Sequence, residues 1–339
     1  MPPPTGGVSI HLWRLQHLLR EDFHISLVDE SRIKKKNLLN LRTLNLVGYL
    51  KIISQAHVIA IHSGTSSLRY LHIIAAKLLR KRVVLTIHSY PKEKTALARI
   101  ADRLMFHLPD TIVVVNAEIL RRVALSRGKT IVNHAFLPPI MDEEEALPPS
   151  INNWIHHAKQ SGRKIICGNA YQLSRFDNQD LYGLDMCIEV ARRLKNRKIP
   201  FRFLFNVATI GRFGDAFTKF QALVDEVGLR DSFSLTNEQF SFVRLMEQSD
   251  LVLRPTNTDG DSLTVREALH LGRPIIVSDA VERPPGTILF RNRDIDDLER
   301  KVLDTIERVG AGTPQSSAPD PDFYYRFYRT MFLKLSGGS

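Results

Sequence analysis

The residues best suited to chemistry are two acids, Asp259 and Glu267, which lie eight positions apart in the second half of the chain. A strand-like apolar run ends at Leu253, a polar loop follows, and a helix-like run begins near Ser262 and stops at Gly272. In an open parallel sheet, ligands bind beyond the carboxyl ends of the strands, where helix N-termini present amide hydrogens. The pattern therefore predicts a site where carboxylates accept hydrogen bonds from sugar hydroxyls and a diphosphate lies on the helix N-terminus.

A plainer interpretation of Glu267 is a capping box, Thr264-x-x-Glu267, in which two side chains close the N-terminus of the helix. A capping box does not account for Gly260 or for the further acids, Asp259 and Asp261, that crowd the loop ahead of the helix. We therefore favour ligand binding at this loop.

The elements that must position these residues are short apolar runs that alternate with helix-like runs through most of the chain. The strand-like runs are 23–28, 57–61, 82–87, 111–115, 164–167, 201–205, 232–235, 250–253, 274–277 and 287–290. The helix-like runs are 65–79, 180–194, 215–227, 240–248 and 294–309. Uninterrupted apolar runs are typical of strands covered on both faces, and strand–helix alternation produces parallel sheets with right-handed crossovers. The sequence thus predicts an α/β fold.

A break in composition divides the chain into two parts. Residues 141–150 hold a run of acids and two prolines, which interrupt regular structure. We predict an N-terminal Rossmann-like domain over 1–140, a linker over 141–150 and a C-terminal Rossmann-like domain over 151–320. The two doubly wound domains are expected to face each other across a cleft. An aromatic helix over 321–335 is expected to follow the second domain.

The composition excludes several classes of protein. The chain has 339 residues, 43% of them hydrophobic and 24% charged, which excludes a largely disordered or collagen-like protein. Its two cysteines, Cys167 and Cys187, are too few for a disulfide framework or a cysteine-rich zinc site, and they fit a reducing compartment. No apolar run reaches the ~20 residues of a membrane span, and the first residues do not resemble a signal peptide. We therefore expect a cytoplasmic protein.

Positive charge is concentrated in the first half of the chain. The net charge is +11; residues 1–140 carry 21 basic and 8 acidic side chains, and residues 141–339 carry 26 and 28. This asymmetry indicates an anionic partner, such as nucleic acid, an acidic lipid surface or a phosphorylated acceptor. Segments 33–39 and 77–82 mix cations with leucine, as membrane-interface segments do, although a solvated helix face explains them equally well. No helix-turn-helix, RNP or zinc-finger pattern occurs, so we expect an anionic membrane surface and no nucleic acid.

The sequence around the two acids resembles the retaining glycosyltransferases of family 4, especially members that build bacterial surface polysaccharides. The segments that carry the resemblance are Arg254-Pro255-Thr256, Asp259-Gly260-Asp261-Ser262, Arg266-Glu267-Ala268-Leu269, 274–279, Arg283-Pro284, Ile288-Leu289-Phe290, Tyr182-Gly183-Leu184-Asp185 and 5–11. The resemblance covers nearly the whole chain. It implies the two-domain GT-B fold, in which the helix over 321–335 crosses back onto the N-terminal domain.

The resemblance also implies roles at the donor nucleotide sugar. Glu267 would bind the ribose, and Asp259 would contact the hydroxyls of the donor sugar as a catalytic residue. The amides of Ser262 and Leu263 would support the diphosphate. Asp259 stands where the family usually has Glu, and the usual phosphate-binding Lys is missing, so Arg175 is the candidate that replaces it.

In the N-terminal domain, Gly6 and Gly7 match the family loop that closes over the donor phosphates. His88 matches a catalytic strand-end histidine of the family near the transferred sugar. The alternative is a loop histidine whose hydrogen bonds are made within the protein. In the C-terminal domain, Tyr182 occupies the position of the family's phosphate-binding Lys. Because the chain begins at the Gly6-Gly7 loop, the first strand of the fold is expected to be absent.

The function that follows is that of a retaining, hexosyltransferase-type glycosyltransferase. It would move a sugar from a UDP- or GDP-linked donor to a lipid-linked glycan. This reaction would belong to polysaccharide biosynthesis at the inner face of the membrane. No cofactor or metal is expected, because no His-Glu-x-x-His motif or Cys/His cluster occurs in the sequence. Gly128-Lys129-Thr130 resembles the end of a P-loop, but Val123 stands where the first Gly belongs, which argues against ATP hydrolysis. A non-catalytic GT-B scaffold or partner subunit, and another sugar-nucleotide enzyme on the same fold, are the alternatives.

Overall fold

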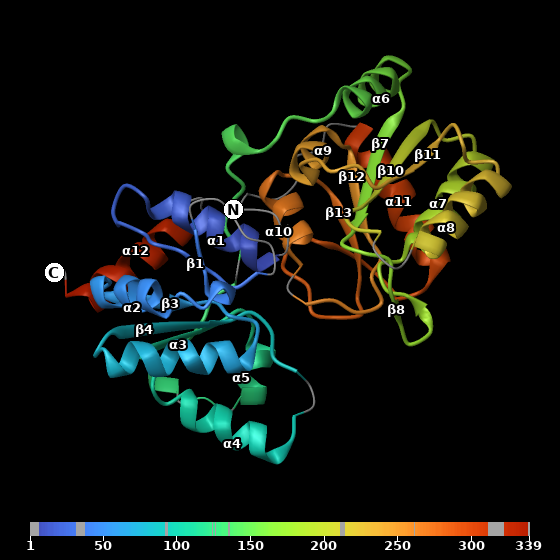
Figure 1. The fold of residues 1–339 in the computed structure, drawn as a ribbon. Coiled ribbons are helices and arrows are strands. Elements are labelled where there is room, and N and C mark those ends of the chain that lie inside the picture. The colour runs from blue at the N-terminus through green and yellow to red at the C-terminus, as the bar shows by residue number, and fades with distance from the viewer. Residues whose placement is uncertain are drawn as a thin grey trace. The chain divides into compact units, whose positions relative to one another are not determined.

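A computed structural model describes residues 7–31, 38–91, 94–123, 125, 127–134, 136–210, 214–260, 262–310 and 322–337. These residues divide into two compact units (Figure 1). The N-terminal unit lies within Met1–Leu137 and Asp320–Ser339, and the C-terminal unit lies within Pro138–Pro319. Each unit is built on a parallel β-sheet flanked by helices, as the alternating runs predict.

The N-terminal unit is built around a four-stranded parallel sheet. Its helices are α1 (Gly7–Leu19), α2 (Leu46–Gln55), α3 (Ser66–Leu78), α4 (Ala96–Met105), α5 (Ala117–Val123) and α12 (Phe323–Ser336). Its strands are β1 (Val28–Asp29), β2 (Leu39–Asn40), β3 (Val58–Ile61), β4 (Arg82–Ile87), β5 (Thr111–Val114) and β6 (Thr130–Val132). The sheet order is β3-β4-β5-β6, and β1 and β2 form a separate parallel pair.

Burial explains the apolar sequence of β4. From Val83 to Ile87, no residue of this strand is more than 2% exposed. A strand that is covered on both faces needs apolar residues at consecutive positions, which is why it reads as an uninterrupted run. On α3, by contrast, Ile73 and Ala76 pack into the core while Leu71 and Ile74 are exposed, as expected for a helix on the surface of a sheet.

The predicted strand at 23–28 is wrong. Only Val28–Asp29 pairs, with Leu39–Asn40, and residues 23–27 form no regular structure. The ring of Phe23 packs against that of Phe332 in α12, with centroids 6.0 Å apart, so this extended segment lies on a helix instead of joining a sheet. The described residues begin with α1, and within them no strand precedes this helix.

The last helix, α12, is held in the N-terminal unit by a few specific contacts. Tyr325 Oη donates a hydrogen bond of 2.8 Å to Asp22, and Arg329 Nε donates one of 2.7 Å to the other oxygen of the same carboxylate. The ring of Tyr324 meets that of Phe136 edge-on, with centroids 5.5 Å apart. These contacts tie the end of the chain to the segments after α1 and before residue 138.

The C-terminal unit contains a six-stranded parallel sheet and a small hairpin. Its helices are α6 (Pro149–Gln160), α7 (Leu184–Asn196), α8 (Gly214–Glu226), α9 (Phe242–Gln248), α10 (Leu263–His270) and α11 (Ile295–Gly310). Its strands are β7 (Lys164–Ala170), β8 (Arg175–Phe176), β9 (Gln179–Asp180), β10 (Phe201–Val207), β11 (Phe233–Thr236), β12 (Leu251–Arg254), β13 (Ile275–Ser278) and β14 (Ile288–Phe290). The sheet order is β11-β10-β7-β12-β13-β14, and β8 and β9 pair as the antiparallel hairpin.

This strand order determines where a ligand can bind. Numbered along the chain, the six strands read 3-2-1-4-5-6 across the sheet, which is the order of the doubly wound nucleotide-binding fold. The direction of winding reverses between β7 and β12, and in folds of this kind ligands bind beyond the carboxyl ends of the strands at the reversal. Residues at the ends of these two strands and at the start of α10 are therefore the first to examine.

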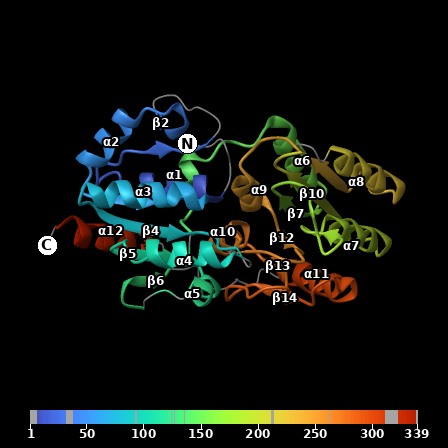
Figure 2. The same cartoon turned by 60° about the horizontal axis from the view of Figure 1, so that its bottom comes forward.

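Two cores cover the faces of this sheet, and helices flank it on both sides (Figure 2). On one face, Ile166, Phe203 and Leu251 pack with residues of α7, α8 and α11. On the other face, their neighbours Ile165 and Leu204 pack with residues of α6, α9 and α10. Because side chains alternate along a strand, both faces are filled from the same apolar runs.

The structure describes both cysteines of the chain and the helices that a membrane span would need. Cys167 in β7 and Cys187 in α7 are both buried and unlinked, and burial raises the pKa of the Cys167 thiol to about 12. Among the helices of the described residues, none has the length and apolar character needed to cross a bilayer.

Candidate functional site

The carboxyl ends of β7 and β12 are joined by side-chain hydrogen bonds. Arg254, the last residue of β12, donates from Nη1 to Asn169 Oδ1 in β7 at 3.3 Å. Thr264, in the first turn of α10, donates from Oγ1 to the same oxygen at 3.2 Å. Asn169 therefore links the two strands at the reversal of the sheet to the N-terminus of α10, where the sequence predicts the donor site.

Asp259 lies at the centre of a buried ion cluster. Arg254 donates to both of its oxygens, from Nε at 2.9 Å and from Nη2 at 3.3 Å, and Arg283 Nη1 donates at 3.1 Å. The exposed fractions of the Asp259, Arg254 and Arg283 side chains are 12%, 10% and 2%. Burial opposes the ionised carboxyl, but the two guanidinium groups outweigh it and hold the pKa of Asp259 below its usual value. Asp259 is therefore ionised at neutral pH.

The hydrogen-bonding capacity of Asp259 is filled within the protein. Besides the three bonds from the arginines, its carboxylate accepts one from Thr256 Oγ1 at 3.3 Å and one from the Gly260 amide at 3.0 Å. A carboxylate offers about four lone-pair sites, so five donors leave no strong position for a further hydroxyl. The structure thus gives Asp259 a structural partnership with Arg254 and Arg283 that the sequence did not predict.

Two guanidinium groups face one carboxylate, so this cluster carries a net positive charge. Burial lowers the pKa of Arg283, and Asp259 raises the pKa of Arg254 against the effect of burial. Arginine side chains carry their charge in proteins at neutral pH. The guanidinium carbon of Arg254 also lies 5.3 Å from the ring centroid of Tyr182, a cation–π contact. Tyr182 therefore contacts a cation and supplies none itself.

The N-terminus of α10 has a buried polar group without a hydrogen-bond partner. Ser262 is the N-cap residue, yet its side chain makes no capping hydrogen bond, and its buried Oγ has no partner among the described residues. Leu263 is the first helical residue, so its amide is one of the donors that a helix start leaves unsatisfied. The helix dipole adds positive character at the same point. The N-terminus of α10 therefore favours an anionic group.

The capping-box interpretation of Glu267 is wrong. A capping box needs its acid three residues after the N-cap, but the N-cap is Ser262 and Thr264 lies inside the helix, bonded to Asn169. Glu267 is the fifth helical residue and only 5% exposed. Glu267 therefore does not occupy the capping-box position of α10.

Gly183 allows close packing at the same edge of the sheet. It is the N-cap of α7 with a φ of +70°, and a Cβ placed there would clash with the carbonyl oxygen of Pro255. No other residue combines this backbone angle with the space available. The loop after β12 and the start of α7 are thus fixed against each other.

Arg175, which the sequence predicts as a donor-binding residue, is not hydrogen-bonded to this cluster. It is in β8 of the hairpin, its side chain is exposed, and its guanidinium makes no hydrogen bond or ion pair within the described part of the chain. The hairpin itself is attached to the site, because Asn257 Nδ2 donates to the Phe176 carbonyl at 3.0 Å. Arg175 is therefore free to turn, whereas Arg254 and Arg283 are fixed.

In the N-terminal unit, the predicted His88 lies beyond β4 and belongs to a group of three histidines. His62 follows β3, and its Nδ1 is 3.0 Å from His88 Nε2. His11 of α1 lies beside both, with ring centroids 5.3 Å from His62 and 5.2 Å from His88. Burial lowers the pKa of His62 well below its usual value, with smaller contributions from His11 and His88. Burial also lowers the pKa of His88 to about 3, with smaller contributions from His11 and Arg69. Gly7 is the first residue of α1, and Gly6 lies outside the described residues.

Comparison with known proteins places this architecture. Residues 170–308 match the family model of the group 1 glycosyl transferases, and a search of curated proteins found no match to the chain. A glycosyltransferase from Rickettsia africae ESF-5 has a similar structure, with a TM-score of 0.66 and 13% identity over 96% of this chain and 88% of that one. Anabaena Alr3699/HepE in complex with UDP and glucose gives a TM-score of 0.64 at 13% identity, covering 98% and 94% of the two chains. The trehalose-phosphate synthase (UDP-forming) of Burkholderia xenovorans gives 0.61 at 13%, covering 98% and 96%. The fold is GT-B.

The GT-B fold confirms the predicted α/β class with two Rossmann-like domains. The family match lies within the C-terminal unit and includes the strand ends, the ion cluster and α10. At 13% identity, the similarity to solved structures establishes the fold and not the substrate.

Sequence reasoning missed several residues of this GT-B site. Arg254 and Arg283 stand in the segments that carry the family resemblance, but nothing local shows that they share one carboxylate across 24 positions. His62 had a visible signal: it follows an apolar strand run, as His88 does, and neighbouring parallel strands end at the same edge. His11 had none, because it is contributed by a helix far from both in sequence.

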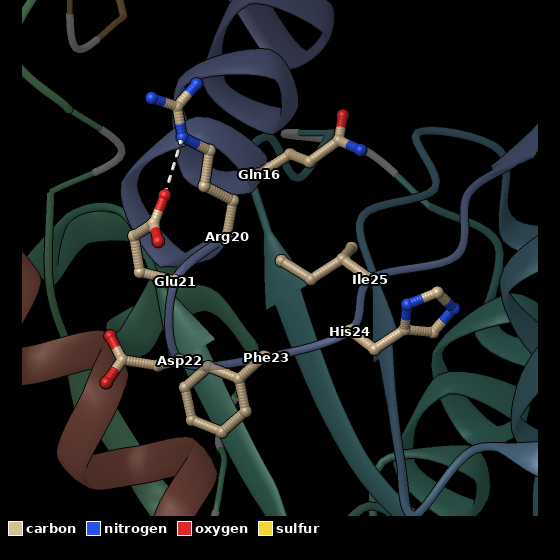
Figure 3. Close-up of a pocket in the computed structure, with 7 residues that line it drawn as sticks. All are labelled: Gln16, Arg20, Glu21, Asp22, Phe23, His24 and Ile25. Atoms are coloured by element: carbon tan, nitrogen blue, oxygen red, sulfur yellow. Dashed lines mark hydrogen bonds and ion pairs between the residues drawn. The ribbon is translucent and has the colours of Figure 1, made fainter.

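A hollow at the end of α1 does not coincide with these groups. The hollow is lined by residue 16 and residues 20–25, which belong to the end of α1 and the segment after it (Figure 3). Arg20 bonds to Glu21 at 3.3 Å, while Asp22 points away toward α12, to which it is bonded. No set of functional groups converges in the hollow, so we assign no ligand to it.

Proposed function

We propose that the protein transfers a sugar from a nucleotide sugar to an acceptor hydroxyl. The observation that carries this proposal is the net positive cluster of Arg254, Arg283 and Asp259 beside the N-terminus of α10, at the reversal of a nucleotide-binding sheet. The group 1 glycosyl transferase match over 170–308 supports it. UDP is the favoured nucleotide, since similar structures include a complex with UDP and glucose and a UDP-forming synthase.

The groups of the site would divide the donor between them. The diphosphate would accept hydrogen bonds from Ser262 Oγ, the Leu263 amide and Arg254, all of which suit an anion. The buried carboxylate of Glu267 would accept hydrogen bonds from the ribose hydroxyls. Asp259, whose oxygens are filled, would act mainly as a positioning residue that fixes Arg254 and Arg283, and any contact with the donor sugar would pass through water.

Retention of configuration is the stereochemical outcome we propose. The acceptor oxygen would attack the anomeric carbon on the face from which the diphosphate leaves, and a phosphate oxygen would take the acceptor's proton as the glycosidic bond to phosphate breaks. The protein would contribute fixed cationic groups that stabilise the charge developing on the leaving diphosphate. His88 in the N-terminal unit would serve the acceptor, and Arg175 would reach the donor only if its exposed side chain turns toward it.

Nucleotide binding tests this proposal. Thermal shift and calorimetric titration of the full chain with UDP, GDP and ADP should show stabilisation by UDP above the others, and at a hundred times the dissociation constant the stabilisation is about 2.7 kcal/mol. Arg254→Met should weaken UDP binding by about 10- to 100-fold, because a charge-assisted hydrogen bond is lost. Arg230→Met is the matched control, since Arg230 is an exposed arginine of the same unit paired with Asp225.

The alternatives are outcomes of the same experiment. A folded full chain that binds none of these nucleotides and hydrolyses no sugar nucleotide would support the first alternative, a non-catalytic GT-B scaffold or partner subunit. Binding of UDP together with conversion of UDP-glucose to another nucleotide sugar would indicate a different sugar-nucleotide enzyme on the same fold. Equal UDP affinity of Arg254→Met and Arg230→Met would remove the ion cluster from the donor site.

We further propose that the acceptor is a lipid-linked glycan of polysaccharide biosynthesis and that α4 meets an anionic membrane surface. The buried residue of α4 is polar: Asp102 accepts hydrogen bonds from Tyr70 at 2.6 Å, from Tyr90 at 2.7 Å and from Lys94. This arrangement turns the apolar side of the helix outward.

The outward side is a single apolar stripe. Leu97, Ile100 and Leu104, here named the α4 stripe, are 80%, 57% and 60% exposed, and their spacing of three and four places them on one face. Arg99 and Arg103, beside them, are exposed as well. Apolar side chains flanked by cations match the acyl and headgroup layers of an anionic bilayer, to which each cation adds about 1 kcal/mol.

Vesicle binding tests the α4 stripe. The full chain should co-sediment with vesicles that contain an anionic phospholipid and not with neutral vesicles. The triple variant Leu97→Ser, Ile100→Ser, Leu104→Ser should lose this binding, and Leu289→Ser, at a leucine 47% exposed in the C-terminal unit, should keep it. Unchanged binding by the triple variant would overturn the assignment of α4, and equal binding to neutral vesicles would overturn the electrostatic argument.

A further inference from the structure

Three histidines of the N-terminal unit bring their rings together beyond the carboxyl edge of its sheet. One ring nitrogen from each of His11, His62 and His88 lies within 4.8 Å of the other two. Their ring centroids are 5.2 to 5.3 Å apart in every pairing. Within the described residues, this is the group of His, Cys, Asp or Glu side chains whose ligand atoms converge in this way.

The fold fixes the positions of these rings. β3 and β4 are parallel neighbours, and Ile61 is paired with Leu85, so the residues after each strand emerge at one edge. His11 is 2% exposed and His62 is 8% exposed. The surrounding protein therefore holds the rings in place without a ligand.

We propose that His11, His62 and His88 form a binding site for a divalent transition metal of the zinc class. Imidazole nitrogen is a preferred ligand of zinc, copper, iron and nickel ions. Three histidines and an open fourth position form the ligand set of zinc sites that bind a water or another exchangeable oxygen ligand. The sequence alone predicts no metal, because the three histidines are not close in the chain.

The distances agree with this ligand set. Two nitrogens on a tetrahedral zinc, each about 2.0–2.1 Å from the metal, are about 3.3–3.4 Å apart. The nitrogens of His62 and His88 are 3.0 Å apart, and the widest separation within the group is 4.8 Å. A bound metal ion would require the rings to turn so that all three nitrogens reach this spacing. The alternative is a purely structural pair in which one neutral imidazole donates a hydrogen bond to the other.

A direct measurement of metal binding distinguishes a metal site from a hydrogen-bonded histidine pair. The full chain, produced without a polyhistidine tag and treated with a chelator, is titrated with Zn²⁺ in competition with a chromophoric chelator. One equivalent should bind with a dissociation constant below the micromolar range. Co²⁺ in place of Zn²⁺ should give the visible absorption bands of a four-coordinate ion. This test does not depend on glycosyl transfer, because the readout is metal binding and not activity.

Variants locate the site. His62→Gln and His11→Gln should each weaken Zn²⁺ binding by at least 100-fold and abolish the Co²⁺ bands, while circular dichroism shows that the fold is retained. His156 and His157 on α6 are exposed, adjacent and able to bind a metal weakly, so the double variant His156→Gln, His157→Gln is the control and should bind Zn²⁺ as the parent does. If either single variant does not fold, the other and the cobalt spectrum of the parent decide the question. A parent chain without stoichiometric Zn²⁺ binding, or binding lost only in the α6 control, would overturn the proposal.

Discussion

At the carboxyl edge of the C-terminal sheet, Asp259 is fixed between two guanidinium groups, and the cluster carries net charge. At the corresponding edge of the N-terminal sheet, His62 and His88 lie 3.0 Å apart, and burial keeps both of them neutral by lowering their pKa values. The first arrangement has its charge in place before any ligand arrives. The second has lone pairs in place and acquires charge only with a bound cation or a proton. The carboxyl edges of these two parallel sheets thus differ in charge: one holds a net positive ion cluster, and the other holds neutral imidazoles.

The largest effect is expected from breaking the charged edge. Asp259→Asn leaves Arg254 and Arg283 buried without a counter-charge, and removing one partner of a buried ion pair costs about 3–5 kcal/mol. Denaturant unfolding followed by fluorescence should show this loss in the transition of the C-terminal unit. Asp225→Asn, which breaks an exposed pair with Arg230, should cost no more than about 1 kcal/mol. Equal losses in the two variants would show that the cluster does not fix this edge.

A second, smaller effect concerns the close packing at the charged edge. Gly183 and Gly228 both have a φ of +70°, but only Gly183 lies against the backbone of Pro255; at Gly228 the nearest atom to an added Cβ is Lys195 Nζ at 3.4 Å. Gly228→Ala should therefore show the backbone term alone, about 1–2 kcal/mol. Gly183→Ala adds a steric overlap and should cost about 1–3 kcal/mol more. The difference between the two unfolding free energies measures the packing, and no difference would contradict it.

The neutral edge should be more tolerant of substitution. His62→Gln exchanges one uncharged polar side chain for another, so the expected loss is that of one buried hydrogen bond, about 1–3 kcal/mol. Unfolding of the full chain without added metal measures this loss, and it should be smaller than that of Asp259→Asn. Zn²⁺ should stabilise the parent and not the His62→Gln variant, because only a native-state ligand shifts the equilibrium. A loss as large as that of Asp259→Asn would show that the histidines are a structural cluster.

Much of the fold could be predicted from the sequence, because buried strands such as β4 and β7 need apolar residues at consecutive positions. The strand predicted at 23–28 was wrong because local alternation does not reveal the partner: Phe23 packs on α12, whose residues lie some 300 positions further along. Asp259 and Glu267 were distinguishable as site candidates from their spacing. Their surroundings were not, because the arginines and histidines that meet at each edge come from strands and helices distant in sequence.

The smallest effect is expected beside the charged edge, at Asp180. Burial, with a contribution from Asp185, raises the pKa of Asp180 to about 6, although the amides of Leu184 and Tyr182 donate to its carboxylate. Since the folded state binds the proton more tightly than the unfolded state, stability attributable to Asp180 is complete below pH 4 and is lost as the pH rises through 6. The side chain is partly exposed, so the loss is on the order of 1 kcal/mol. Asp180→Asn keeps an oxygen for the two amides and should flatten the unfolding free energy between pH 4 and 7. Asp225, whose pKa is lowered by Arg230, has the opposite sign: its contribution is lost as the pH falls, so Asp225→Asn should leave the slope between pH 4 and 7 as it is in the parent. An Asp180→Asn variant with the parent's slope in this range would show that this carboxyl is ionised throughout and that the hydrogen bonds from the amides of Tyr182 and Leu184 outweigh the effect of burial.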